Sequence, residues 1–253
     1  MSDIKLNYLT PARFTSGRII EYDIQAANAN ILYSKKYIDE DEYKKITSMA
    51  KMNREIYIGN MIKKRPEVYT VIRSGITEYV KRLLVENNVQ EDEVVRIAND
   101  AVYINRMTDL PNTEFDHVRF VQKSKANNMV NINNVLIFSN YDNNQIDVET
   151  KNLGELSSEL HQKYLLGFIA NTIYLFERVS VEEAIQSVSN FYNDYVNRRL
   201  PVEYYMTFNS TPNYEIMANN FKITSAPSIN DININYNLNV LRELYSILMD
   251  YFH

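Results

Sequence analysis

The sequence predicts an α+β fold, in which an antiparallel sheet carries a helical insertion and is followed by a mainly helical C-terminal part. Two short apolar segments, residues 19–25 and 94–104, have the pattern of strands on either side of two helical patterns. Residues 115–150 alternate apolar and polar side chains between turn signals. Most of residues 151–253 has helical periodicity. We therefore expect a sheet-containing region, 1–150, with a helical region, 151–253, packed on it or merged with it in one domain.

The composition is that of a globular protein. Of 253 residues, 45% are hydrophobic and 23% are charged, which is ordinary for a soluble domain. No apolar run approaches the roughly 18 residues of a membrane span, and the N-terminus lacks the layout of a signal peptide, so we expect a cytoplasmic protein. The abundance of Asn, Ile, Lys and Tyr favours AT-rich codons. This bias suggests a phage protein that works in the cytoplasm of the host cell.

Residue counts exclude several kinds of site. The chain has no cysteine, which rules out disulfides and thiolate metal sites. The three histidines are scattered along the chain, so a histidine zinc site is not expected. The five glycines never cluster, so a glycine-rich loop that cradles phosphates is not expected either.

Charge is unevenly distributed along the chain. The net charge is −5, which is the wrong sign for a protein that coats nucleic acid. Residues 44–82, however, hold ten Lys and Arg against three Glu. This local excess of positive charge suits either a phosphate-binding surface or a solvated helix face.

The first half of the chain has a clear order of elements. The strand at residues 19–25 ends at Asp23, and a helical segment, 26–37, follows. Asp39 is an expected N-cap of one helix through residue 64, because acidic residues fill its first turn and lysines its end. Ile46, Met49, Tyr57 and Met61 are expected on its buried face. Pro66 is expected to begin a second helix, which ends near residue 84.

The strand at residues 94–104 raises a question, because Asp100 interrupts its apolar run. A buried carboxylate is costly unless it is paired, hydrogen-bonded or bound to a metal. Asp100 therefore marks either a bend at a strand end or a functional carboxylate.

The second half of the chain reads as strands and then helices. Turn signals at "KANN" and "YDNN" divide residues 117–150 into two or three strands. Helices are expected at about 153–176, from a capping box at Ser180 to Glu183, and at 239–252. A short strand is expected at 202–208, followed by a turn region at 209–216.

The order strand with Asp23, basic helix, strand with Asp100 has a chemical meaning. Two carboxylates on adjacent strands can hold two divalent ions about 3.5–4 Å apart, which activate the attacking oxygen and stabilise the leaving one. A positive helix above them would bind a triphosphate. Oxygen ligands suit Mg²⁺, so the scarcity of His and the lack of Cys do not count against such a site.

Three of these segments resemble the motifs of family B DNA polymerases and their phage relatives. "EYDIQAANANIL" (21–32) is similar to motif A, "KMNREIYIG" (51–59) to motif B of the fingers helix, and "RIANDAVYI" (96–104) to motif C. "FYNDYVNRRLPVEYYMTF" (191–208) is similar to the region that follows the palm. The resemblance covers residues 19–106 and 190–208 and implies a palm-like sheet with a fingers-like helical insertion.

The resemblance implies a template-directed nucleotidyltransferase with a two-metal mechanism. Asp23 and Asp100 would be catalytic and would bind Mg²⁺ or Mn²⁺. Nucleotide would be bound by Lys51, Arg54, Asn28 and Tyr57. Nucleic acid and nucleoside triphosphates would be its partners, together with other polymerase or replisome subunits, and no membrane is expected.

Departures from the family keep two alternatives open. Ala98 replaces the first aspartate of motif C, and Asn28 replaces the motif A tyrosine that blocks the ribose 2′-hydroxyl. One alternative is a catalytically inactive palm-like subunit that binds nucleic acid or a replication or transcription partner. The other is a phage structural or assembly protein, in which the Asn-rich hairpins of residues 115–150 and the amphipathic C-terminal helix would be interaction surfaces and Asp23 and Asp100 would lie far apart. For the single residues, the alternatives are that Asp23 caps the helix that follows and that Asp100 marks a bulge or a strand end.

Overall fold

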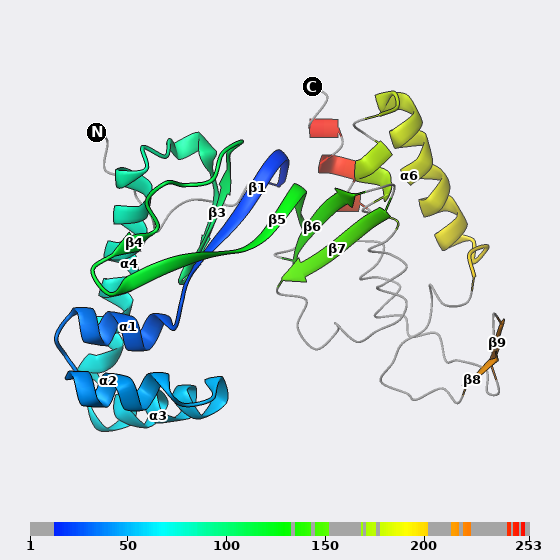
Figure 1. The fold of residues 1–253 in the computed structure, drawn as a ribbon. Coiled ribbons are helices and arrows are strands. Elements are labelled where there is room, and N and C mark those ends of the chain that lie inside the picture. The colour runs from blue at the N-terminus through cyan, green and yellow to red at the C-terminus, as the bar shows by residue number, and fades with distance from the viewer. Residues whose placement is uncertain are drawn as a thin grey trace. The chain divides into compact units, whose positions relative to one another are not determined.

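The computed structural model describes most of the N-terminal half of the chain and parts of the C-terminal half (Figure 1). The described residues are 13–132, 135–142, 145–151, 168, 171–175, 178–201, 214–217, 220–223, 242–243, 245–247 and 249–250. Helices accompany an antiparallel sheet, so the predicted α+β fold is confirmed. Among the described helices, none is long and apolar enough to cross a bilayer.

The main sheet has the strand order β2-β3-β1-β5-β6-β7, with β4 paired to β5. Its strands are β1 (Phe14–Ile24), β2 (Val94–Ala98), β3 (Ala101–Asn105), β4 (Glu114–Phe115), β5 (Val118–Ile132), β6 (Val135–Asp142) and β7 (Gln145–Lys151). The β1–β3, β2–β3, β5–β6 and β6–β7 ladders are antiparallel. The chain divides into two compact units, one with the described residues 17–126 and one with residues 13–16 and the described residues from 127 onward.

The first unit contains α1 (Ala27–Ser34), α2 (Glu40–Thr47), α3 (Lys51–Lys64), α4 (Glu67–Glu86) and a short 3-10 turn, η1 (Glu91–Glu93). Asp39 caps α2 as predicted, because its side chain accepts a hydrogen bond from the backbone of Glu42 at 2.8 Å. Pro66 directly precedes α4, also as predicted. One apolar cluster joins β1, β3, α1 and α4, and a second joins α1 to α2, α3 and α4.

The prediction of one helix over residues 40–64 is wrong, because α2 ends before Ser48 and α3 begins after Ala50. Ile46 and Ile58 would lie about 120° apart on a continuous helix. The break lets both side chains reach the same apolar cluster. Met61 is buried there as expected, whereas Met49 and Tyr57 are only half-buried.

The prediction of one strand through Asp100 is also wrong. Strands β2 and β3 form a hairpin in which Ala98 pairs with Ala101, so Asn99 and Asp100 are the two residues of its turn. Asn99 has a φ of 56°, a left-handed conformation that asparagine tolerates better than most residues and that two-residue hairpins require. Asp100 therefore lies at the tip of a hairpin and not within a strand. This position agrees with the interpretation of Asp100 as a bend at a strand end.

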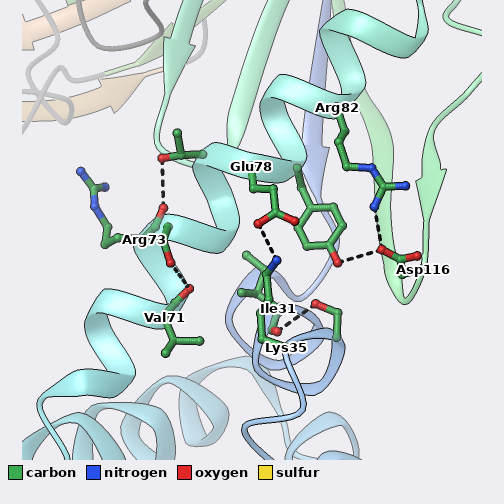
Figure 2. A network of polar contacts seen from close by, with 11 residues as sticks. Ile31, Lys35, Val71, Arg73, Glu78, Arg82 and Asp116 are labelled. Carbon is green, nitrogen blue, oxygen red and sulfur yellow. Dashed lines mark hydrogen bonds and ion pairs between the residues drawn. The ribbon is translucent and has the colours of Figure 1, made fainter.

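Polar contacts tie helix α4 to three other parts of the first unit, and Figure 2 shows those with Lys35 and Asp116. Glu78 accepts a hydrogen bond from Lys35 of α1 at 2.5 Å. Arg82 and Tyr79 both donate to Asp116, between β4 and β5, at 2.6 and 3.1 Å. Arg73 donates to the side chain of Asn99 at 3.1 Å. Helix α4 is thus hydrogen-bonded both to the β2–β3 turn and to the C-terminal end of α1.

The second unit corrects the predicted turn at "KANN", because β5 runs through these residues. Asn128 pairs with Ser139 in the ladder and donates to the Tyr141 hydroxyl at 2.8 Å, and Asn127 accepts from the Tyr141 backbone at 2.8 Å. Hydrogen bonds to β6 therefore satisfy the asparagines that otherwise favour a turn.

Elsewhere in the second unit, the capping box at Ser180 is confirmed and begins α6 (Val181–Val196). Part of the predicted turn region is a strand instead, since β8 (Tyr214–Met217) pairs with β9 (Asn220–Ile223). Helical residues at 168, 171–175 and within 242–250 belong to two of the other predicted helices. The predicted strand at 202–208 lies outside the described residues.

Candidate functional site

A pocket of about 280 Å³ lies in the first unit, where the end of β1 and the start of α1 meet α3, the β2–β3 turn and β5. It brings together five of the six predicted site residues: Asp23, Asn28, Lys51, Arg54 and Asp100. The other lining residues are Ile24, Gln25, Ala26, Ala27, Glu55, Ile58, Val121 and Lys123. Segments separated by up to a hundred residues of sequence thus contribute polar groups to one small volume.

The two aspartates are neighbours because β1 and β3 pair antiparallel. Asp23 pairs with Ala101, and the Ile24 backbone amide donates to the carbonyl of Asp100 at 3.1 Å. The Asp23 residue is 8% exposed, while Asp100 is half-buried at the turn. The register of this one ladder therefore places both carboxyl groups at the same end of the sheet.

Asp100 is the group whose ionisation the site disfavours. Burial raises its pKa above the ordinary value, and the negative charge of Asp23 raises it further. The two carboxyl groups are close enough for a hydrogen bond between them to contribute to this shift. The backbone amide of Asp100 and the charge of Lys123 act in the opposite direction. Two like charges thus share one site, as metal-binding and acid–base carboxylates do.

Lys123 is a site residue that the sequence did not reveal. Its ammonium group forms an ion pair with Asp23, and this hydrogen bond raises the pKa of the lysine. Lys123 and Val121 both line the pocket, as expected for alternate residues of one strand. That alternation was visible in the sequence, but nothing local indicated that β5 would lie next to the strand of Asp23.

The start of α1 forms another wall of the pocket. Ala26 precedes the helix with φ 46° and ψ 45°, and no side chain caps the first turn. The amides of a helix N-terminus attract anions, and more so without a competing side-chain acceptor. Asn28 lies half-buried in this first turn. The arrangement offers backbone donors next to the carboxylate pair.

Helix α3 supplies positive charge to the lining of the pocket. Lys51 and Arg54 lie one turn apart on α3 and both line the pocket. Within the described residues, neither side chain has an acidic partner or a hydrogen bond. Two cations that have no acidic partner in the described part of the chain, beside a helix N-terminus, are suited to bind phosphate groups.

Tyr57 is not brought to the pocket. Its hydroxyl donates to Glu42 of α2 at 3.1 Å, and the Lys45 ammonium lies 4.9 Å from its ring centre. Tyr57 therefore joins α3 to α2. It does not line the pocket with the other predicted nucleotide-binding residues.

The carboxylate pair fits a hard divalent cation that is also held by its substrate. Asp23 and Asp100 are two oxygen ligands, and among the described residues no group of three or more acidic, His or Cys side chains could hold a metal. Mg²⁺ in phosphoryl-transfer sites is bound by one or two carboxylates together with substrate phosphates and water. The ammonium of Lys123 on Asp23 shows that this position already accepts a cation.

Comparison with known proteins places the chain in a phage family. None of the curated proteins matches it. Residues 5–250 match the family described as bacteriophage PBS1 gene 130 protein, which is almost the entire chain. The predicted phage origin is thereby confirmed, while the resemblance to family B polymerases stays a prediction. The chain belongs to the bacteriophage PBS1 gene 130 protein family.

Proposed function

We propose that this protein is a Mg²⁺-dependent nucleotidyltransferase that adds nucleotides to a nucleic acid in a polymerase-like manner, with a nucleoside triphosphate as the donor and pyrophosphate as the leaving group. One observation carries the proposal: Asp23, Asp100, Lys51 and Arg54 line a single pocket. Carboxylates and cations that line one pocket are what a triphosphate with its metal ions requires. A chance resemblance would not have to bring these four residues together.

Each group has a role in this proposal. Asp23 and Asp100 would hold Mg²⁺ or Mn²⁺, which when bound neutralises phosphate charge and activates the attacking hydroxyl. Lys51, Arg54 and the amides at the start of α1 bind the phosphate oxygens and orient the chain of phosphates. Asn28, which lines the pocket in the first turn of α1, would contact the sugar. The side chain of Asn28 is smaller than the motif A tyrosine of family B DNA polymerases, so it leaves more room beside the sugar.

Nucleotide incorporation tests the proposal directly. The full chain is incubated with labelled deoxy- or ribonucleoside triphosphates, Mg²⁺ or Mn²⁺, and primed or unprimed templates. We expect incorporation that Asp100→Asn lowers at least about 100-fold, since a metal ligand is removed. Asp109→Asn is the matched control, because Asp109 is exposed, pairs with Arg18 at 2.5 Å and lies outside the pocket. Full activity of Asp100→Asn, or no incorporation with any template, contradicts the proposal.

One observation favours a second candidate, a catalytically inactive palm-like subunit. The hairpin brings one carboxylate to its tip, and Ala98 stands where the resembling family has another. Such a subunit would bind triphosphate or nucleic acid without incorporation. The structural or assembly alternative expects Asp23 and Asp100 to lie far apart; the pairing of Asp23 with Ala101, next to Asp100, supports the proposal instead.

A further inference from the structure

Lys123 occupies an unusual position for a surface lysine. Its side chain is 52% exposed, yet its ammonium group pairs with Asp23, whose side chain is 12% exposed. A buried carboxylate without a partner is unfavourable, and here a second carboxylate, Asp100, lies beside it. Lys123 reaches into the pocket from β5 and provides the missing positive charge.

Three carboxylates act on this one ammonium group. Asp23, Glu21 and Asp100 all stabilise the charged form of Lys123. Glu21 is buried two residues before Asp23 on β1 and accepts hydrogen bonds from Tyr103 at 3.2 Å and Ser124 at 2.6 Å. Removal of the lysine charge would take away the ammonium group that pairs with Asp23 and whose charged form all three carboxylates stabilise.

We infer that Lys123 is an internal counter-cation of the Asp23–Asp100 pair, and that a divalent cation binds there by displacing it. This inference rests on the proposed function and adds a regulation of the same site. Asp23 cannot give its full charge to the ammonium and to a divalent ion at once, and two cations so close repel each other. The Lys123 side chain can leave the pocket without disturbing the core, because about half of its surface already meets solvent.

The inference predicts that loss of the lysine tightens metal binding. Mn²⁺ affinity is measured by isothermal titration calorimetry, without nucleotide, for the wild type, Lys123→Met and Lys125→Met. We expect Lys123→Met to bind Mn²⁺ at least about tenfold more tightly than the wild type, since no competing cation has to leave. Lys125 is the matched control, because it lies on the same strand, is 46% exposed, and approaches Asp109 at 3.7 Å; Lys125→Met should stay within about twofold of the wild type.

A second measurement uses the wild type and does not depend on the folding of a variant. The rate of Lys123 acetylation by an amine-reactive reagent is followed by mass spectrometry with and without Mg²⁺. Displacement from Asp23 should raise the Lys123 rate at least about threefold, with no change at Lys125. An unchanged Lys123 rate at a Mg²⁺ concentration that saturates the site overturns the inference.

The outcomes separate this inference from the proposed function. Equal or weaker Mn²⁺ binding by Lys123→Met, with binding abolished by Asp23→Asn/Asp100→Asn, overturns the counter-cation and leaves the metal site standing. An absence of Mn²⁺ binding in every variant, even with a triphosphate present, overturns both. Tighter binding by Lys123→Met that the two aspartate substitutions abolish supports both.

Discussion

At the scale of single residues, Asp100 is held where its ionised form destabilises the fold. Its pKa is raised by burial and by the charge of Asp23, so the folded state binds its proton more tightly than the unfolded state does. Stability then falls as pH rises from the ordinary aspartate value through the raised one. This cost is typical of functional carboxylates, which are placed for chemistry rather than for stability.

We therefore expect Asp100→Asn to raise the melting temperature at pH 7 in metal-free buffer. Because Asp100 is half-buried and screened by solvent, the rise should be small, about 2 °C. The difference should vanish at acid pH, where Asp100 is protonated in the wild type. Differential scanning calorimetry across pH 3–8 measures it.

Asp109 gives the opposite sign and serves as the control. Its hydrogen bond with Arg18 lowers the pKa of Asp109, so its contribution to stability is present above the unfolded pKa and is lost as pH falls through the lowered one. Asp109→Asn should lower the melting temperature at pH 7 and not at the acid end. A fall in melting temperature for Asp100→Asn at pH 7 would contradict the conclusion that the ionised form of Asp100 destabilises the fold.

At the scale of elements, α1 and α4 approach each other closely at one glycine. A methyl group at Gly75 would meet the Cγ2 atom of Ile31 at 2.3 Å, and Ile31 is fully buried. A side chain at this position must push α1 away from α4 or distort the first apolar cluster. Since α1 carries Asn28 and follows Asp23, this contact also sets one wall of the pocket.

We expect Gly75→Ala to destabilise the protein by about 1–3 kcal/mol, because overpacking outweighs the gain of up to about 1 kcal/mol in helix propensity. Gly59→Ala is the matched substitution on α3, where a methyl group meets nothing within 4 Å. It should stabilise the protein by about 0.5–1 kcal/mol. Urea unfolding of both variants measures the difference, and equal effects of the same sign would refute the close contact.

At the scale of the whole molecule, the pocket depends on segments that meet only in the folded chain. Lys51 and Arg54 come from α3, Asp23 from β1, Asp100 from the β2–β3 turn, and Lys123 from β5. Of the basic residues in 44–82, Lys51 and Arg54 line the pocket and the others do not. We interpret the first turn of α3 as the part that faces the pocket, and its last turn as a helix C-terminus favoured by the helix dipole.

Triphosphate binding tests this division of the helix. Lys51→Ala/Arg54→Ala should weaken binding of a nucleoside triphosphate at least about tenfold, because charge-assisted hydrogen bonds contribute about 1.5–3 kcal/mol each. Lys63→Ala/Lys64→Ala removes equal charge from the last turn of α3, outside the pocket lining, and should change affinity less than about threefold. Similar losses in both double variants would show a diffuse charge effect instead of a site.

The sequence by itself determined the type of most elements and the chemistry available to the pocket. Asp39, Pro66 and the Ser180 capping box set helix starts through local hydrogen bonds and backbone restriction. Such signals act within a few residues and are therefore readable. The order of Asp23, basic helix and Asp100 could also be read from the sequence, because it depends only on the order of residues along the chain.

The tertiary structure decided which of these groups meet. The register of β1 on β3 sets Asp23 against Ala101, the hairpin turn brings Asp100 to the tip, and the place of β5 in the sheet adds Lys123. Tertiary contacts also decided two other features. Burial of Ile58 favours the break between α2 and α3. Hydrogen bonds to β6 favour the passage of β5 through "KANN". Local periodicity shows which side of a strand a residue occupies, but pairing between distant strands depends on the packing of the whole unit.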